Sequence, residues 1–126
     1  MRIISGEKKG KKISPPKNLL IRPTTDKAKE ALFNIITNIY DITNCNILDI
    51  YSGSGNISYE FESRGAKVTS IDNNINTIKF LKKESNDLKL DIYAVKSDVF
   101  SYIKKTNQSF DIIFADPPYN FSKSEY

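Results

Sequence analysis

The sequence predicts an α/β fold in which a parallel sheet carries helices on both faces. From residue 46 onward, short apolar runs alternate with segments whose apolar residues recur at helical spacing. Strands are expected at 46–51, 67–72, 90–95 and 110–115, and helices between them at 57–64, 75–86 and 99–105. Because parallel strands need long crossovers, this alternation favours βαβ units with right-handed connections.

An earlier helix is expected to begin at Thr24 or Thr25, since either hydroxyl can cap it. Six apolar residues at helical spacing are expected to face the core: Ala28, Ala31, Leu32, Ile35, Ile36 and Ile39. Two short strands, at 2–5 and 11–14, are expected to form a hairpin across a turn rich in Gly and Lys. The sequence therefore predicts a basic arm at 1–23 and an α/β domain at 24–126.

Composition narrows the class of protein. The 126 residues suffice for one domain, and 39% of them are apolar, which can fill a core. No stretch is long and apolar enough for a transmembrane helix, and the start has no signal-peptide pattern, so we expect a cytoplasmic protein. With no histidine and one cysteine, a zinc site or a Ser-His or Cys-His nucleophile is essentially excluded.

The net charge of +4 is distributed unevenly. Against the single acid Glu7, the first segment carries Lys8, Lys9, Lys11, Lys12, Lys17 and Arg22. Such an arm suits the phosphate backbone of a nucleic acid. A solvated, solubilising tail explains the charge equally well, and charge alone does not decide between the two.

Polar residues follow each predicted strand, where ligands bind in a doubly wound sheet. After the first strand comes a loop that begins at Asp49 and contains Ser52, Gly53 and Gly55. It lacks the third glycine of a dinucleotide loop and the Gly-Lys-Ser/Thr of a phosphate loop. An acid ahead of the glycines instead suits the cationic methionine end of S-adenosylmethionine. A plain strand–helix turn is the alternative.

Acids follow the second and third strands as well. Asp72 ends the second strand about 20 residues beyond the glycines, the place of a ribose partner. Asp98 follows the third strand and could receive an adenine amino group. Either acid could instead cap the following helix, as could Asn73 or Asn74 in the case of the second strand.

The fourth strand leads into Asp116, Pro117, Pro118 and Tyr119. Prolines lack an N–H, so this turn offers carbonyl acceptors without competing donors. Asp116 adds a carboxylate acceptor, and Tyr119 adds a ring on which a base can stack. Acceptors around an exocyclic amino group free its lone pair for attack on a methyl sulfonium. A Pro-Pro turn that merely ends a strand is the alternative.

Together these motifs resemble the class I (Rossmann-like) S-adenosylmethionine-dependent methyltransferases that act on amino groups. The blocks at 1–6, 10–12, 21–26 and 29–34 are similar to the bacterial 16S rRNA guanine-N2 methyltransferase family of the RsmD type. The resemblance implies methylation of one guanine of the small ribosomal subunit on N2, with no metal. In it Asp49, Ser52, Gly53 and Gly55 would line the methionine end of the cofactor, Asp72 its ribose and Asp98 its adenine.

The same resemblance implies which residues bind the substrate and which strands of the family's fold this sequence lacks. Asp116 and the Pro117 carbonyl would hold the guanine amino group, and Tyr119 would stack on the base. Arg22, Thr24 and Thr25 would shape the cofactor or target pocket. Family members continue for about another third of their length with further strands, so we expect a truncated form whose exposed edge strand at 110–115 could pair with a second copy. An adenine-N6 methyltransferase and a non-catalytic RNA-binding module remain alternatives.

Overall fold

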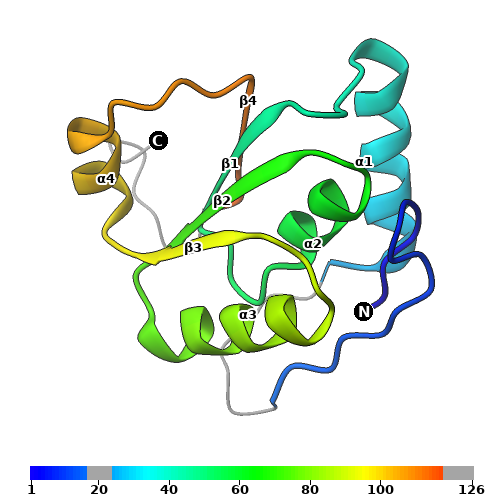
Figure 1. Cartoon of the computed structure of the whole chain (residues 1–126), viewed down its shortest axis with the longest axis horizontal. Coiled ribbons are helices and arrows are strands. Elements are labelled where there is room, and N and C mark those ends of the chain that lie inside the picture. The colour runs from blue at the N-terminus through cyan, green and yellow to red at the C-terminus, as the bar shows by residue number, and fades with distance from the viewer. Residues whose placement is uncertain (17–23, 118–126) are drawn as a thin grey trace.

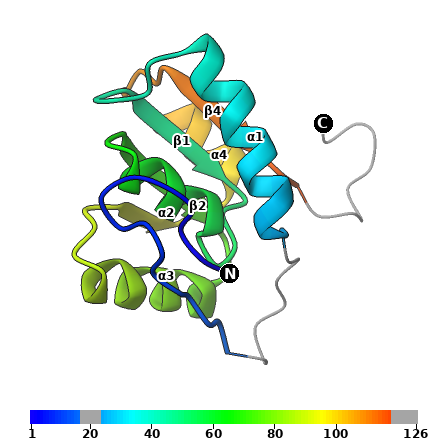
Figure 2. The ribbon, with the colours of Figure 1, turned by 90° about the vertical axis from the view of Figure 1, so that its right-hand side faces the viewer.

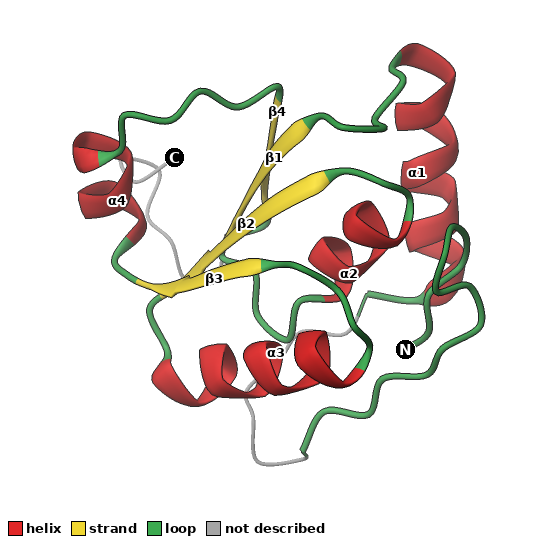
Figure 3. Cartoon of the chain, in the orientation of Figure 1, coloured by secondary structure: helices red, strands yellow, loops and turns green. Residues whose placement is uncertain are grey.

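The structure is a computed structural model that describes residues 1–16 and 24–117. Its elements are α1 (Asp26–Ile39), β1 (Asn46–Ile50), α2 (Asn56–Ser63), β2 (Lys67–Asp72), α3 (Ile75–Asp87), β3 (Tyr93–Lys96), α4 (Val99–Lys105) and β4 (Ile112–Ala115). Strands and helices alternate from β1 to β4, as the sequence predicts (Figure 3). Within the described residues, no helix is long and apolar enough to cross a membrane.

All four strands are parallel and lie in the order β3-β2-β1-β4. Neighbouring residues of β1 point to opposite faces of this sheet. Ile47 packs with Phe33 of α1 and with α2, whereas Leu48 packs with Val99 of α4. Helix α3 packs against β3, since Ile78 lies in one buried cluster with Ala94. It covers the same face of the sheet as α1 and α2 (Figure 1). Helices on both faces of a parallel sheet are therefore confirmed.

Helix α1 turns only part of the predicted stripe to the core. Leu32 and Ile36 pack against the core cluster, as predicted, whereas Ala28 and Ala31 are exposed. The Thr25 hydroxyl caps it by accepting from Ala28 N at 3.0 Å, so one of the two predicted caps is confirmed. The buried residues are Lys29 and Phe33, while Ile35 and Ile39 are 61% and 65% exposed. Helical periodicity identifies the apolar face of a helix but not which side of that face packs against the core. In α1 it is the side that carries Phe33.

Three further expectations need correction. The helical spacing of Ile75, Ile78 and Leu81 predicts that all three face inward, but Ile75 is 45% exposed at the first position of α3. Strand β3 begins at Tyr93 rather than at residue 90, because the backbone of Leu90 is bonded to Ser85 instead of to a strand. Strand β4 begins at Ile112 rather than at residue 110. It lies at an edge of the described sheet, as expected for 110–115, so its apolar run is not buried and alternates between half-buried and exposed residues.

The hairpin at residues 1–13 is short and packs against the α/β core. Ile3 N donates to Lys11 O at 2.9 Å and Ile13 N to Met1 O at 3.0 Å, but the predicted strands reduce to one antiparallel bridge between Arg2 and Lys12. Ile3 and Ile13 are buried in one cluster with Tyr59, Ile78, Leu81 and Ala94. The hairpin thus lies against α2 and α3 (Figure 2). The predicted domain boundary near residue 23 stays a prediction, because residues 17–23 lie outside the described ranges.

Gly6 and Gly10 offer a matched test of how closely this hairpin approaches α2. Both have φ of +86°, but a Cβ at Gly6 would lie 2.0 Å from the carbonyl oxygen of Ser63, whereas a Cβ at Gly10 meets nothing within 4 Å. Both alanine variants suffer the same backbone strain, so the clash with Ser63 is what distinguishes the stability of Gly6→Ala from that of Gly10→Ala. We expect Gly6→Ala to lower the free energy of unfolding in urea by about 2 kcal/mol more than Gly10→Ala. Equal losses would mean that the hairpin can move off α2 at little cost.

Candidate functional site

The carboxyl ends of the strands meet at one edge of the sheet. Ile50 lies beside both Ile71 and Ala115, and Asp72 lies beside Lys96. The residues that follow these positions therefore surround a single region. They are the loop that starts at Tyr51, the Asp72 carboxylate, the turn at 97–98, and Asp116 with Pro117. The four polar features predicted from the sequence are brought together.

The Gly-rich loop between β1 and α2 is a strained turn. Tyr51, Gly53 and Gly55 all have positive φ, of 59°, 56° and 91°. Glycine tolerates this conformation, but a tyrosine rarely adopts it, and such strain is concentrated at functional sites. A Cβ at Gly55 would lie 2.9 Å from the side chain of Leu81, so the loop also needs this glycine for close packing.

The loop is held by the end of β2. Ser52 N donates to Ile71 O at 3.1 Å, and Gly53 N donates to Oδ2 of Asp72 at 3.0 Å. The other carboxylate oxygen of Asp72 accepts from Asn74 N at 2.9 Å. Asn74, not Asp72, caps α3. The helix-cap alternative for Asp72 therefore falls away, and its carboxylate instead braces the loop.

The Asp49 carboxylate lies beneath the loop rather than on its surface. It is 1% exposed, and Oδ2 accepts from the Ser58 hydroxyl at 2.6 Å. The Ser58 hydroxyl is in turn 2.5 Å from that of Ser70. Burial raises the pKa of Asp49 to about 7, the Ser58 hydrogen bond opposes the rise, and the charges of Asp72 and Asp116 add to it. Repulsion from these two carboxylates thus favours the protonated form of Asp49.

The Ser52 hydroxyl is the clearest sign of a ligand position in the described part of the chain. Its Oγ is buried and has no hydrogen-bond partner there. Leaving a buried hydroxyl unpaired costs about 1–3 kcal/mol, and most buried polar atoms find a partner. A ligand with a polar group over the Gly-rich loop would supply that partner. The residues present therefore fit a bound cofactor at this loop.

Asp98 and Asp116 have different surroundings. Asp98 caps α4 by accepting from Ser101 N at 2.9 Å, so the cap alternative is realised, and its predicted adenine contact stays a prediction. Asp116 is exposed and Pro117 is half-buried at the end of β4. Pro118 and Tyr119 lie outside the described residues, so the predicted stacking of a base on Tyr119 is a prediction still.

The predicted RNA-binding residues lie mostly on the hairpin. Lys9, Lys11 and Lys12 are exposed, and the half-buried Lys8 has its Nζ 3.8 Å from Glu7. Thr25 caps α1, and Thr24 contacts the residue that follows the loop, because its carbonyl oxygen accepts from Asn56 Nδ2 at 3.4 Å. Arg22 lies outside the described residues.

Sequence reasoning missed the polar residues behind the loop. Ser58 and Ser70 pair with Asp49, but a serine in a helix or strand carries no signal of its own. Polar residues at 69 and 70, between the apolar Val68 and Ile71, were the available hint. Lys29 and Glu60 are fully buried as an ion pair, and nothing in their local sequence distinguishes them from solvated helix residues.

Comparison with known proteins identifies relatives. A family model described as Conserved hypothetical protein 95 matches residues 1–126. Ribosomal RNA small subunit methyltransferase D of Buchnera aphidicola subsp. Baizongia pistaciae is 38% identical over 94% of this chain and 61% of that protein. The chain thus spans about three fifths of the length of this relative.

Solved structures agree with the fold. A putative methyltransferase, yhhF, from Escherichia coli has a TM-score of 0.82 at 30% identity, covering 95% of this chain and 65% of that one. The T. thermophilus 16S rRNA N2 G1207 methyltransferase, in complex with AdoMet and guanosine, has a TM-score of 0.67 at 23% identity, covering 80% and 28%. At that identity the second likeness supports the fold alone. The methyltransferase fold predicted from the sequence is confirmed.

Proposed function

The chain belongs to the family of Conserved hypothetical protein 95, and on that premise we propose that it binds S-adenosylmethionine and methylates the N2 amino group of a guanine in 16S rRNA. The resemblance inferred from the sequence is thus confirmed at the level of the family. The observation that carries the proposal is the meeting of the Gly-rich loop, Asp72 and Asp116 at one edge of the sheet. The name of the Buchnera relative supports ribosomal RNA as the substrate.

On the cofactor side, the Gly-rich loop would receive the methionine end and Asp72 the ribose. Ser52 Oγ, buried and unpaired among the described residues, is a ready partner for a polar group of the ligand. Asp49 lies buried beneath the loop, and a cationic amine bound above it would favour the ionised form of its carboxyl. Asp98 stands at the adjacent strand end as the candidate adenine partner. S-adenosylmethionine would supply the activated methyl on its sulfonium, so no metal is needed.

On the substrate side, Asp116 and the Pro117 carbonyl would accept from the guanine amino group and orient its lone pair. Their work would be positioning and electrostatic stabilisation. Tyr119 would stack on the base, and Arg22, Thr24 and Thr25 would border the pocket. The contact of Thr24 with Asn56 supports that border, because it brings the start of α1 to the exit of the loop.

Two other functions remain open. An adenine-N6 methyltransferase would use the same acceptors, and the name of the Buchnera relative specifies ribosomal RNA but no base. A non-catalytic RNA-binding module would keep the basic hairpin and lose the cofactor. Calorimetry that shows no binding of S-adenosylmethionine at millimolar concentration would favour that module over both enzymes.

The partners follow from the proposed substrate. They are 16S rRNA and the small ribosomal subunit or an assembly intermediate, which would place the protein in the cytoplasm. Pairing with a second copy along residues 110–115 stays a prediction. In the part of the chain that is described, β4 forms an edge of the sheet and Ile113 is 58% exposed, which keeps such pairing feasible.

Removing the Asp72 carboxylate tests the cofactor site. We expect Asp72→Ala to weaken binding of S-adenosylmethionine by about tenfold to a hundredfold, since it loses a charged hydrogen-bond acceptor worth about 1.5–3 kcal/mol. Isothermal titration calorimetry measures the change. Asp87→Ala is the matched control, because Asp87 is an exposed acid at the far end of α3. Equal affinities for the wild type and Asp72→Ala would remove Asp72 from the site.

Neutralising the hairpin tests RNA binding. Replacing Lys8, Lys9, Lys11 and Lys12 by glutamine should weaken binding to 16S rRNA and flatten its dependence on salt, because fewer counterions are released. The logarithmic slope should fall by up to about 3 when measured by filter binding between low and moderate salt. An unchanged slope would reduce the hairpin lysines to a solubility feature.

A further inference from the structure

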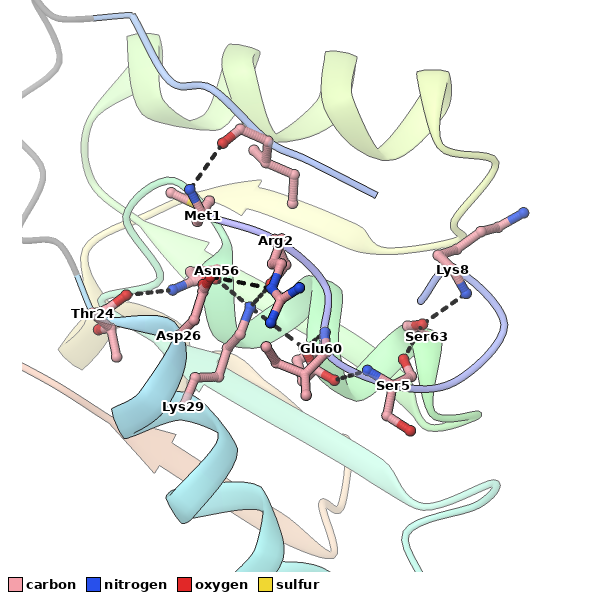
Figure 4. Close-up of polar contacts among 12 residues, drawn as sticks. Met1, Arg2, Ser5, Lys8, Thr24, Asp26, Lys29, Asn56, Glu60 and Ser63 are labelled. Carbon is pink, nitrogen blue, oxygen red and sulfur yellow. Dashed lines mark hydrogen bonds and ion pairs between the residues drawn. The ribbon is translucent and has the colours of Figure 1, made fainter. Parts of the chain in front are cut away.

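Lys29 is fully buried, and its ammonium reaches two other parts of the chain. Nζ donates to the carbonyl oxygen of Arg2 in the hairpin and to Oδ1 of Asn56 at 2.8 Å, and lies 3.4 Å from Oε1 of Glu60 (Figure 4). An ammonium has three N–H donors, and these three acceptors can use them all. One side chain of α1 therefore joins the hairpin to α2.

Asn56 places this cluster at the exit of the Gly-rich loop. It is the first residue of α2, directly after Gly55, which is the N-cap and has no side chain with which to cap the helix. The Asn56 side chain is held from both sides, by Lys29 at Oδ1 and by the Thr24 carbonyl at Nδ2. The end of the loop is thus fastened to α1 rather than by its own helix cap.

Glu60 connects the same cluster to the hairpin. Its carboxylate is fully buried and accepts from the backbone amides of Ile4 at 2.8 Å and Ser5 at 3.1 Å, and from Arg64 Nε at 2.8 Å. Its charge therefore anchors the strand that leads into the lysine-rich turn. The turn at 6–10 and the Gly-rich loop are linked through two adjacent buried charges.

Stability alone does not account for such a cluster. Burying an ammonium and a carboxylate costs several kcal/mol for each ion, and well-packed apolar side chains in their place are often as stable. Unlike apolar contacts, directed hydrogen bonds favour one specific arrangement of the groups that they join. The groups joined here are the exit of the loop, the start of α1 and the hairpin.

We propose that Lys29 is a positioning residue: through Asn56 its ammonium holds the Gly-rich loop in the conformation that receives the cofactor. The same ammonium ties that loop to the hairpin through the Arg2 carbonyl and Glu60. The inference rests on the proposed function only for the identity of the ligand. The conformation of the loop is a property of the unliganded chain and can be measured there.

The first experiment is amide hydrogen exchange, followed by NMR, on the unliganded chain carrying Asn56→Ala. This variant leaves Lys29 paired with Glu60 and Arg2, so it should fold. The Gly53 and Gly55 amides, bonded to Asp72 and to Ser52 O, should exchange about tenfold faster, whereas the Ile3 amide of the hairpin should not change. Asn76→Ala is the control, because Asn76 is an exposed asparagine in the first turn of α3.

The second experiment measures affinity for S-adenosylmethionine by calorimetry, under conditions where circular dichroism shows each variant folded. Lys29→Met should weaken binding about tenfold, and Lys29→Arg should recover most of it, since it restores a buried cation. Lys27→Met, an exposed lysine of the same helix, should bind like the wild type. A merely structural role would lower the free energy of unfolding and leave the affinity of the folded variants unchanged.

The outcomes separate the two proposals. Unchanged loop exchange in Asn56→Ala, together with wild-type affinity in Lys29→Met, would overturn the role of Lys29. A wild-type chain that binds no S-adenosylmethionine would overturn the proposed function, while loop exchange would still decide whether Lys29 positions the loop.

Discussion

Asp116→Ala is expected to slow methyl transfer by about 10²–10³-fold, the range typical of losing one preorganised group that hydrogen-bonds the reacting centre. Asp116 is exposed at the end of β4, where a base could reach it, and its charge acts on the buried Asp49. Affinity for S-adenosylmethionine should stay within about twofold, since no cofactor contact is removed. Transfer of a labelled methyl group to 30S particles that lack the modification measures the rate, and calorimetry measures the affinity.

Asp111→Ala is the matched control for this loss. Asp111 precedes the same strand at its other end, where Oδ2 accepts from Asn46 N at 2.7 Å. Its removal should lower stability and leave the rate of transfer by the folded protein close to that of the wild type. If Asp116→Ala instead lost cofactor binding, Asp116 would have a cofactor or structural role and the substrate side of the proposal would fail.

The pH dependence of folding is the second large expected effect, and it comes from Asp49. Its pKa is about 7 in the folded protein against 3.8 for the unperturbed group. Between pH 3.8 and about 7, Asp49 is protonated in the folded state and ionised in the unfolded state. Its contribution to stability is therefore full below pH 3.8 and is lost as the pH rises to about 7. A gap of about 3 pH units corresponds to about 4 kcal/mol.

Asp49→Asn should remove that dependence, because an amide can replace the protonated acid beside Ser58 without ionising. At pH 4 the variant and the wild type should have similar free energies of unfolding in urea, and at pH 8 the variant should be more stable by up to about 4 kcal/mol. Glu62, whose pKa burial also raises to about 7, contributes in the same direction. Comparing the variant with the wild type at each pH isolates Asp49. Parallel stability curves would contradict the raised pKa.

Local signals in the sequence were sufficient for the order of the elements. The bounds of β2 and α4 agree with those predicted, because Gly65 ends α2 with φ of +98° and Asp98 caps α4. The ends of elements without such a signal were predicted less accurately. Strand β4 was predicted to begin at residue 110 but begins at Ile112, since an apolar run does not show at which residue strand pairing starts.

The sequence by itself determined the parallel α/β class, the candidate residues at the strand ends and the charge of the hairpin, because periodicity, glycine, proline and lysine act locally. Only the tertiary structure decided that Asp49 is buried against Ser58 and that Asp72 braces the loop. It also decided that Lys29 faces inward to meet Asn56 and Glu60. Each depends on groups far apart in the chain, since burial and pairing are set by the three-dimensional surroundings of a side chain and not by its neighbours in sequence.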